Sequence, residues 1–326
     1  MVQVSREDFS VAAATNASAY RRITIPVLRI EAGPGPAVAL LAGVHGDEWE
    51  GQAAILDLWH HLPANLQRGT VYLLPAVNAE ASLAGTRLSP ADGGNLNRAF
   101  FGAPARGYTE SIAAALEARL LPRIQAMVDV HSGGASLRYL PSSVITRYGD
   151  DAYDERLPAL ARAFGMPHCM FFRGNEAGSM PAAASRHGVL RLSAEIGGGR
   201  ETSSTLVDQC RDGLLGCLGA LGLLSERASS GNADISLHDL DAPAATLRTR
   251  EPGVFVPDVE LGQSVSAGQR IGRLMEPARP DMPMRPLSSP QAGTIVCLRA
   301  IARSDDGDCL LQVAPALPLD SLVSKY

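Results

Sequence analysis

The stretch that decides the fold is residues 43–51, which read Gly43-Val44-His45-Gly46-Asp47-Glu48-Trp49-Glu50-Gly51. An apolar run at residues 37–42 precedes it and has the continuous hydrophobicity of a strand covered on both faces. A helical pattern over residues 48–61 follows it. The stretch is therefore a turn from a buried strand into a helix, where open α/β sheets place their ligands.

His45 and Glu48 stand three residues apart in this turn. An imidazole nitrogen and a carboxylate oxygen at this spacing can both reach one zinc ion, at about 2.0–2.2 Å. Gly43 and Gly46 give the backbone room to turn. Taken alone, the segment also fits a plain surface turn whose glutamate is favoured by the helix dipole.

Two further apolar strands end in side chains that can do chemistry. The run at residues 126–130 ends at His131, and the run at residues 189–194 ends at Glu195, which glycines follow closely. Two histidines and one carboxylate, with a position left for water, are typical of catalytic zinc sites. Glu195 is then a candidate general base, and the alternative is a glutamate held in a salt bridge at the strand end.

Two arginines and an asparagine complete the candidate site. Arg98 offers a planar fork for a substrate carboxylate, and Asn97 offers an additional donor. Arg87 could polarise a carbonyl group or stabilise an oxyanion. The plainer interpretation is that each arginine is a solvated surface charge.

Strand and helix patterns alternate through the first part of the chain, which predicts an α/β fold with a mixed sheet and helices on both faces. The predicted strands are residues 23–30, 37–42, 70–77, 126–130, 139–146 and 189–194, and the predicted helices are residues 48–61, 110–124, 154–164, 179–187 and 203–224. The polar stretch at residues 225–232 marks a boundary between a catalytic domain (1–230) and a β-rich domain (231–326).

The β-rich part has short strand-like runs with glycine at the corners, as expected for a small barrel or sandwich. It resembles the biotinyl/lipoyl-type barrel. The only lysine of the chain is Lys325, so the turn that would carry a modified lysine in such a barrel has none. A structural or site-capping role is therefore expected.

Composition excludes several classes of protein. The chain has 326 residues, 46% of them hydrophobic, and a net charge of −5 without a basic patch, so it is globular and is not expected to bind nucleic acid or anionic membranes. The five cysteines form no C-x-x-C pair, which argues against a disulfide framework. With no apolar run of about 18 residues and no leader-like start, we expect a cytoplasmic protein. The sequence leaves a homo-oligomer open.

Four motifs in this order, followed by a β-rich module, resemble the succinylglutamate desuccinylase/aspartoacylase family, which is related to the zinc carboxypeptidases. The motifs are G-x-H-G-D-E, N-L-N-R, D-x-H-S-G-G and A-E-I-G-G-G. The resemblance implies one zinc ion held by His45, Glu48 and His131, Glu195 as catalytic acid and base, Asn97 and Arg98 as binders of the substrate carboxylate, and Arg87 as the carbonyl-polarising arginine.

Asn95 departs from the D-L-N-R motif of many family members. An asparagine can still accept a hydrogen bond from a ligand histidine, but it raises the basicity of the imidazole less than aspartate does. The Asn form resembles a branch that acts on small N-acetylated amino acids such as N-acetyl-diaminobutyrate.

The function expected from the residues and the resemblance is zinc-dependent hydrolysis of the amide bond of a small N-acetyl or N-succinyl amino acid, with Glu195 as general base. Two alternatives stay open: a zinc carboxypeptidase acting on short peptides, and a noncatalytic metal- or ligand-binding protein on the same scaffold.

Overall fold

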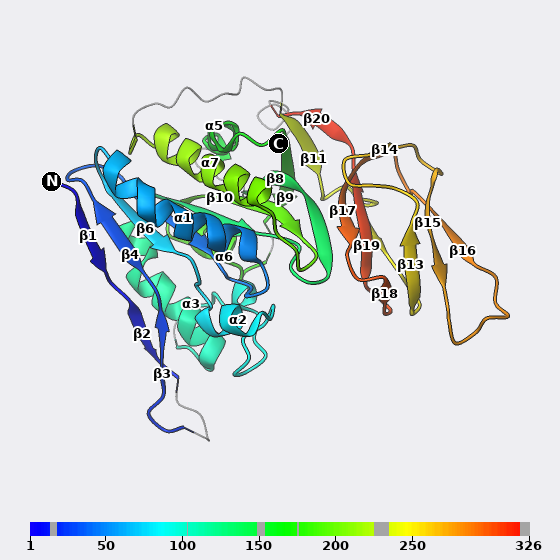
Figure 1. Ribbon diagram of the computed structural model, residues 1–326, viewed down its shortest axis with the longest axis horizontal. Helices are drawn as coiled ribbons and strands as arrows, with labels where there is room; N and C mark the ends of the chain where they lie inside the picture. Colours follow the sequence, from blue (N-terminus) through cyan, green and yellow to red (C-terminus); the bar gives the residue numbers. More distant parts are fainter. Residues whose placement is uncertain (14–17, 103, 149–153, 175, 225–234, 320–326) are drawn as a thin grey trace.

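The computed structural model describes residues 1–13, 18–102, 104–148, 154–174, 176–224 and 235–319 (Figure 1). The strands before residue 225 are β1 (Gln3–Arg6), β2 (Phe9–Ala12), β3 (Arg22–Ile25), β4 (Leu28–Glu31), β5 (Ala37–Ala42), β6 (Thr70–Leu74), β7 (Ala126–His131), β8 (Leu137–Arg147), β9 (His168–Arg173) and β10 (Leu190–Gly198). The helices are α1 (Trp49–Asn65), α2 (Ala79–Ala84), α3 (Tyr108–Arg119), α5 (Leu157–Phe164), α6 (Met180–Arg186) and α7 (Ser204–Ala220), with short 3₁₀ turns η1 (Leu96–Arg98) and η2 (Leu121–Arg123).

The later strands are β11 (Ser236–Asp239), β12 (Thr246–Arg248), β13 (Gly253–Pro257), β14 (Ser264–Val265), β15 (Arg270–Met275), β16 (Arg285–Ser288), β17 (Gly293–Arg299), β18 (Arg303–Ser304), β19 (Cys309–Ala314) and β20 (Ala316–Pro318). A large mixed sheet runs in the order β1-β4-β6-β5-β7-β10-β8-β17-β19-β12. The predicted mixed α/β fold with a β-rich C-terminal region is confirmed.

Three neighbouring parallel strands at the centre of this sheet decide where the site lies. β7 pairs in parallel with β5 on one side and with β10 on the other. Parallel neighbours end at the same edge of a sheet, so the residues that follow β5 and those at the ends of β7 and β10 meet there.

Helices cover both faces of the sheet (Figure 1), and alternation along the strands explains why. Leu40 of β5 packs in an apolar cluster with residues of α1, α5 and α7. The next residue, Leu41, packs in a second cluster with residues of α3 and α6. Because successive side chains of a strand point to opposite faces, a strand buried on both faces must be apolar throughout.

The single strand predicted at residues 23–30 is wrong, because Pro26 interrupts it. Proline lacks a backbone N–H and cannot donate to a sheet ladder. The segment therefore splits into β3, which pairs with β2 in a separate ribbon, and β4, which joins β1 and β6 in the large sheet. Similarly, the helix predicted at residues 110–124 ends at Arg119, before Pro122.

The C-terminal strands continue the large sheet and add a smaller one. β17 pairs with β8, and β11 pairs with β9, while β16-β15-β13-β18 form a four-stranded sheet. An apolar cluster joins the two groups, with Phe255 and Ile271 from the small sheet and Ile295 and Leu311 from the large one. The predicted domain boundary at residues 225–232 lies outside the described residues.

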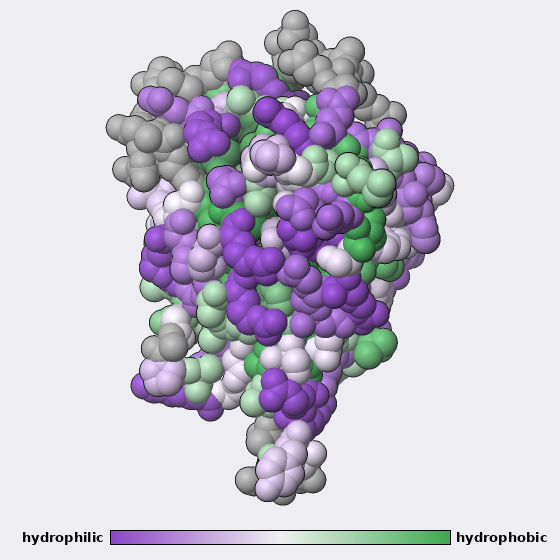
Figure 2. All heavy atoms as spheres, turned by 90° about the vertical axis from the view of Figure 1, so that its left-hand side faces the viewer, coloured by the Kyte–Doolittle hydropathy of each residue, from purple (hydrophilic) through white to green (hydrophobic). Residues whose placement is uncertain are grey.

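The opposite edge of the large sheet is β1, whose residues are all exposed. Figure 2 views the molecule from the side of this edge and shows mainly hydrophilic side chains there, with hydrophobic ones in small patches. Polar side chains on an edge strand discourage pairing with another chain. Among the described residues, no helix combines the length and the apolar character needed to cross a membrane.

Candidate active site

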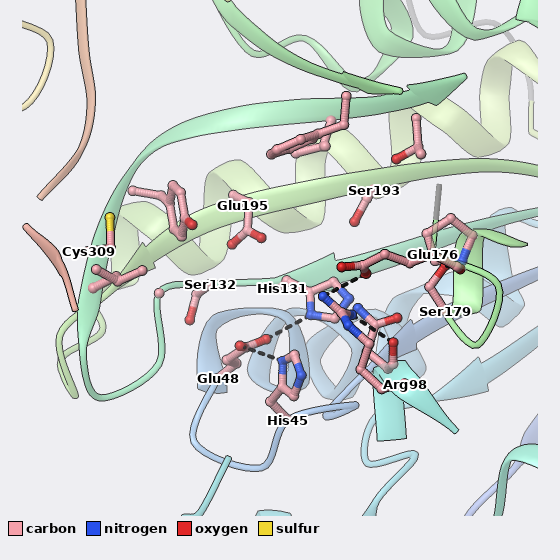
Figure 3. Close-up of a pocket in the computed structure, with 18 of the residues that line it drawn as sticks. His45, Glu48, Arg98, His131, Ser132, Glu176, Ser179, Ser193, Glu195 and Cys309 are labelled. Atoms are coloured by element: carbon pink, nitrogen blue, oxygen red, sulfur yellow. Dashed lines mark hydrogen bonds and ion pairs between the residues drawn. The ribbon is translucent and has the colours of Figure 1, made fainter. Parts of the chain in front are cut away.

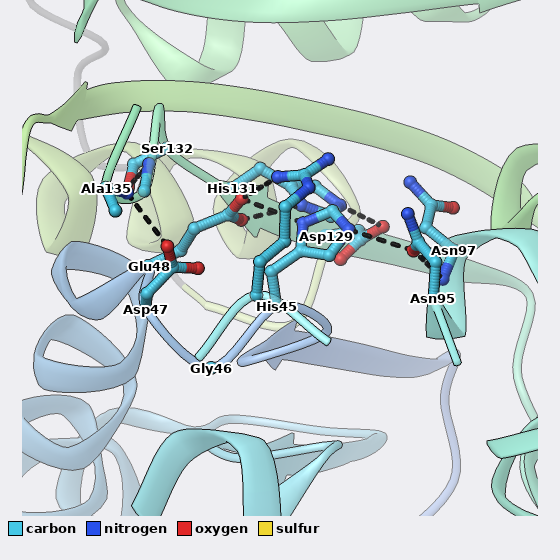
Figure 4. Close-up of polar contacts among 12 residues, drawn as sticks. His45, Gly46, Asp47, Glu48, Asn95, Asn97, Asp129, His131, Ser132 and Ala135 are labelled. Carbon is cyan, nitrogen blue, oxygen red and sulfur yellow. Dashed lines mark hydrogen bonds and ion pairs between the residues drawn. The ribbon is translucent and has the colours of Figure 1, made fainter. Parts of the chain in front are cut away.

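His45, Glu48 and His131 come together at the shared edge of β5 and β7 (Figure 4). The Glu48 carboxylate lies between the two rings, with Oε1 2.8 Å from Nδ1 of His45 and Oε2 2.9 Å from Nδ1 of His131. All three side chains are buried, and their ligand atoms lie within 4.8 Å of one another. This group could hold a metal ion.

Local packing explains why the turn after β5 has this shape. Gly43 adopts a φ of +71°, which glycine tolerates best. A Cβ on Gly46 would lie 1.9 Å from the carbonyl carbon of Ala81, so only glycine lets the turn approach α2 this closely. Asp47 accepts a hydrogen bond from the Ala135 backbone N–H (2.8 Å), which fastens the turn to the loop after β7.

Each histidine has a polar partner at Nε2, the ring nitrogen that does not face Glu48, and we call this residue its outer partner. Nε2 of His45 lies 3.1 Å from Oδ1 of Asn95, and Nε2 of His131 lies 3.1 Å from Oδ2 of Asp129. Arg191 donates to the same Asp129 oxygen at 2.6 Å. These contacts keep both Nδ1 atoms directed at Glu48, as outer partners of metal-binding histidines do.

Asp129 is a functional residue that was not among those predicted from the sequence. It could have been found from the strand pattern, because residues two apart in a strand share a face and Asp129 precedes His131 by two. A charged residue in an otherwise apolar strand is itself a signal.

The electrostatics favour a cation at this point. Burial opposes ionisation of Glu48, but the two histidines outweigh burial and lower the pKa of Glu48 to about 2. Burial also acts against the charged form of His131, yet the Asp129 and Glu48 carboxylates raise its pKa well above the usual value. The same carboxylates would stabilise a divalent cation.

The donor set is compatible with zinc. Two imidazoles and one carboxylate are a common zinc set, and ligand atoms at about 2.0–2.2 Å around a tetrahedral ion lie roughly 3.3 Å apart. The present separations of 2.8 Å and 2.9 Å between Glu48 and the two Nδ1 atoms need only a small expansion.

Glu195 lies beside this group on β10, with His131 as its Cα partner across the parallel pair. Its Oε2 atom is buried and has no hydrogen-bond partner among the described residues. Burial raises the pKa of Glu195 to about 8, although the charge of His131 acts in the opposite direction. A carboxyl group with such a pKa can both accept and donate a proton near neutral pH.

The strand that carries Glu195 is irregular just after it. The pairing of β10 with β8 shifts register between Glu195 and Gly197, and Gly197 and Gly198 have positive φ. Glu50 of α1 accepts a hydrogen bond from the Gly198 N–H at 3.0 Å. The positive φ values of the glycines and this hydrogen bond place the end of β10 next to the start of α1.

The remaining predicted residues line the same cleft, which has a volume of about 560 Å³ (Figure 3). Nη1 of Arg87 lies 3.2 Å from Oε1 of Glu48. Asn97 accepts a hydrogen bond from the Met180 backbone N–H (3.0 Å), so its Nδ2 group is the donor it can offer a ligand. The structure therefore brings all the sequence-predicted site residues, including Arg98 and Glu195, to one cleft.

The C-terminal strands form part of the cleft wall, which the sequence did not predict in detail. Arg248, Arg299, Asp308 and Cys309 line the cleft together with the residues at the ends of β5, β7 and β10. In Figure 3, Cys309 lies at the far end of the cleft from Arg98. Residues from both parts of the chain thus surround the candidate site.

Residues 34–221, more than half of the chain, match the model of the succinylglutamate desuccinylase/aspartoacylase catalytic domain. The chain belongs to this family. It is 30% identical over 298 residues to N-alpha-acetyl-L-2,4-diaminobutyric acid deacetylase of Halomonas elongata, covering 91% of this chain and 87% of that protein.

Solved structures of family members agree with this assignment. The product-bound ectoine utilization protein EutE (DoeB) of Ruegeria pomeroyi superposes with a TM-score of 0.90 at 28% identity, covering 96% of this chain and 95% of that one. A succinylglutamate desuccinylase of Silicibacter gives a TM-score of 0.89 at 26% identity with the same coverage. The resemblance to the deacetylase branch of the family is confirmed, and relatives named in it are deacylases.

Proposed function

We propose that this protein is a zinc-dependent amidohydrolase that cleaves the amide bond of a small N-acyl amino acid and releases a carboxylic acid and a free amine. One observation carries the proposal: a carboxylate oxygen of Glu195 is buried without a partner beside a buried group of His45, Glu48 and His131. A metal-binding protein that only stores or senses its ligand has no need of this additional base.

His45, Glu48 and His131 would hold the zinc ion. When bound, the ion would act as a Lewis acid that lowers the pKa of water and polarises a carbonyl group. Glu195 accepts a proton from the attacking water at Oε2 and then donates it to the leaving nitrogen. Arg87 stabilises negative charge on the acyl oxygen.

Arg98 and Asn97 hold the substrate carboxylate, so that the scissile bond lies within reach of Glu195. Arg98 supplies charge and Asn97 supplies its Nδ2 donor. The cleft, with a volume of about 560 Å³, is large enough to hold an N-acyl amino acid.

Elemental analysis of the purified protein tests the ligand assignment. We expect about one zinc per chain in the wild type and an empty site in His45→Ala, Glu48→Ala and His131→Ala. His61 is a matched control, because it lies on α1 with a side chain that is 69% exposed. Full zinc occupancy in all three variants would show that the ligands are elsewhere.

A substrate panel separates the proposal from its rivals. Hydrolysis of N-acetyl and N-succinyl amino acids, without hydrolysis of a blocked dipeptide, supports the deacylase. The reverse result supports a zinc carboxypeptidase. Zinc binding without turnover of either substrate class would indicate a noncatalytic protein.

We further propose that the chain comprises a catalytic domain at residues 1–230 and a β-rich domain at residues 231–326. We propose that the β-rich domain is a small barrel or sandwich that forms one wall of the cleft. The apolar cluster shared by β13, β15, β17 and β19 supports a small barrel or sandwich. We also propose that the protein acts in the cytoplasm. Expression of residues 1–230 alone tests the division: a folded product supports two domains, and an unfolded product shows that the strands after residue 230 complete the core of the first part.

A further inference from the structure

Glu50 is a buried carboxylate near the active site that the reaction described above does not use. It lies in the first turn of α1, two residues after the candidate ligand Glu48, and is 1% exposed. Its side chain does not line the cleft. A buried carboxylate is costly unless polar groups compensate it, so the contacts of Glu50 indicate what it does in the fold.

Two polar groups from the strand ends around the cleft compensate this carboxylate. Oε1 of Glu50 accepts a hydrogen bond from the Gly198 N–H, at the end of β10, at 3.0 Å. Burial raises the pKa of Glu50, and hydrogen bonds from Ser132 and Gly198 act in the opposite direction. Ser132 directly follows His131 at the end of β7. One side chain therefore joins the start of α1 to the ends of β7 and β10.

The end of β10 depends on such contacts because its pairing is irregular there. The parallel pairing with β7 ends at Glu195, and the antiparallel pairing with β8 shifts register between Glu195 and Gly197. Beyond this point the Gly133 N–H donates to the Gly197 carbonyl oxygen at 3.1 Å, and the next residue, Gly198, donates to Glu50. Contacts with the loop after β7 and with α1 thus hold the segment that follows Glu195.

The Glu195 side chain has little other support. In the part of the chain that the structure describes, its buried Oε2 atom has no hydrogen-bond partner. The position of this carboxylate is therefore set by the backbone that carries it. A general base has to lie within hydrogen-bond reach of the water that it deprotonates, and a displacement of about 1 Å can cost about 10²-fold in rate.

We propose that Glu50 is a positioning residue for Glu195, because its hydrogen bond from the Gly198 N–H fixes the irregular end of β10 and keeps the Glu195 carboxylate within reach of the attacking water. This inference rests on the proposed function, because it takes Glu195 as the general base. The role requires a hydrogen-bond acceptor at residue 50 and no negative charge. An amide oxygen can accept the same bond, whereas an apolar side chain leaves the buried Gly198 N–H without a partner.

Glu50→Gln and Glu50→Met separate the acceptor from the size of the side chain. With an N-acetyl amino acid as substrate, we expect Glu50→Gln to keep kcat near the wild-type value. Glu50→Met should lower kcat by about 10- to 100-fold, with little change in KM and unchanged zinc content. Glu50→Asp, which keeps the charge but is one methylene shorter, should give an intermediate kcat and replaces Glu50→Met as the test if that variant does not fold.

A double variant distinguishes positioning of Glu195 from a general loss of structure. If Glu50 acts through Glu195, the addition of Glu50→Met to Glu195→Gln should lower kcat by less than about 2-fold, because the group that Glu50 positions is already disabled. A further fall as large as that in the single Glu50→Met variant would overturn the inference and make Glu50 a purely structural residue.

Glu117→Met is a matched control. Glu117 is also a helical carboxylate, 7% exposed, and accepts a hydrogen bond from a glycine, the Gly102 N–H, at 2.9 Å, but it does not line the cleft. Its loss should lower the Tm and leave kcat of the folded enzyme near the wild-type value.

Two results with the single variants would overturn the inference and leave the proposed function standing. One is a wild-type kcat in Glu50→Met, and the other is an equal fall of kcat in Glu50→Gln and Glu50→Met. A zinc-loaded wild type that hydrolyses no N-acyl amino acid would instead overturn both the proposed function and the inference.

Discussion

The candidate metal group and an ion pair between Arg98 and Glu176 lie in one cleft but differ in burial. His45, Glu48 and His131 are 3–5% exposed and are each held by outer partners or by one another. Nη2 of Arg98 lies 2.7 Å from Oε2 of Glu176, and both side chains are about half exposed. Charges interact more strongly in a buried site than at an exposed one, where water screens them.

From this difference in burial we expect the metal group to serve the reaction and the exposed pair to serve substrate recognition. The buried group keeps one geometry, because any displacement would leave buried charges without partners. The exposed pair can exchange one partner for a ligand at little cost. Substitutions in the buried group should therefore change turnover or metal binding, and substitutions in the exposed pair should change substrate binding.

Glu195→Gln should have the largest effect on turnover. Glutamine has nearly the same shape but cannot accept the proton of water, so kcat should fall by about 10²–10⁴-fold while zinc content stays unchanged. Steady-state kinetics together with metal analysis provide the measurement. A variant with near-normal kcat and normal zinc would refute Glu195 as the base.

Asp129→Asn should weaken zinc binding by about 10–100-fold, because the outer partner of His131 loses its charge. The reverse change, Asn95→Asp, gives His45 a charged partner and should tighten binding. Competition with a chelator measures both affinities, and thermal unfolding checks that each variant is folded. Equal affinities in both variants and the wild type would show that the outer partners only orient the rings.

Arg98→Lys should raise KM by about 10-fold and change kcat less. Lysine keeps the charge but lacks the planar fork that can bind a carboxylate through two parallel hydrogen bonds. Arg106→Lys is a control, because Arg106 is exposed outside the cleft lining. A fall in kcat with an unchanged KM would move Arg98 from recognition to the chemical step.

A separate effect concerns a partly buried histidine pair that is not part of the cleft lining. Nε2 of His238 lies 3.1 Å from Nδ1 of His168, and burial, together with the charge of His168, lowers the pKa of His238 to about 4. In the unfolded chain, His238 takes up a proton near pH 6.5, whereas in the folded protein it stays neutral until about pH 4. Stability should therefore fall by up to about 3 kcal/mol as the pH drops through this range.

Urea unfolding of the wild type and His238→Gln at several pH values between 7.5 and 4.5 measures this contribution. The variant should lose less stability on acidification than the wild type does. His61→Gln, which changes an exposed histidine, should follow the wild-type curve. Identical slopes for wild type and His238→Gln would mean that the pair does not resist protonation.

Much of the centre of the molecule could be predicted from the sequence. The strand at residues 37–42 matches β5 at both ends, because a strand buried on both faces is an uninterrupted apolar run. His45, His131 and Glu195 were expected at strand ends, and parallel strands bring such ends together. Pro26 is the sequence signal that separates β3 from β4 where a single strand was predicted.

Contacts between segments far apart in the sequence depend on the tertiary structure. No local pattern connects Arg98 to Glu176, or Arg248 and Cys309 to the edge of β7, because loop conformation and strand order bring them together. Because hydrophobic periodicity is local, the sequence alone indicates which side chains can do chemistry and near which strand ends they lie. Which charges face one another in the cleft depends on packing between distant segments, which a single sequence does not express.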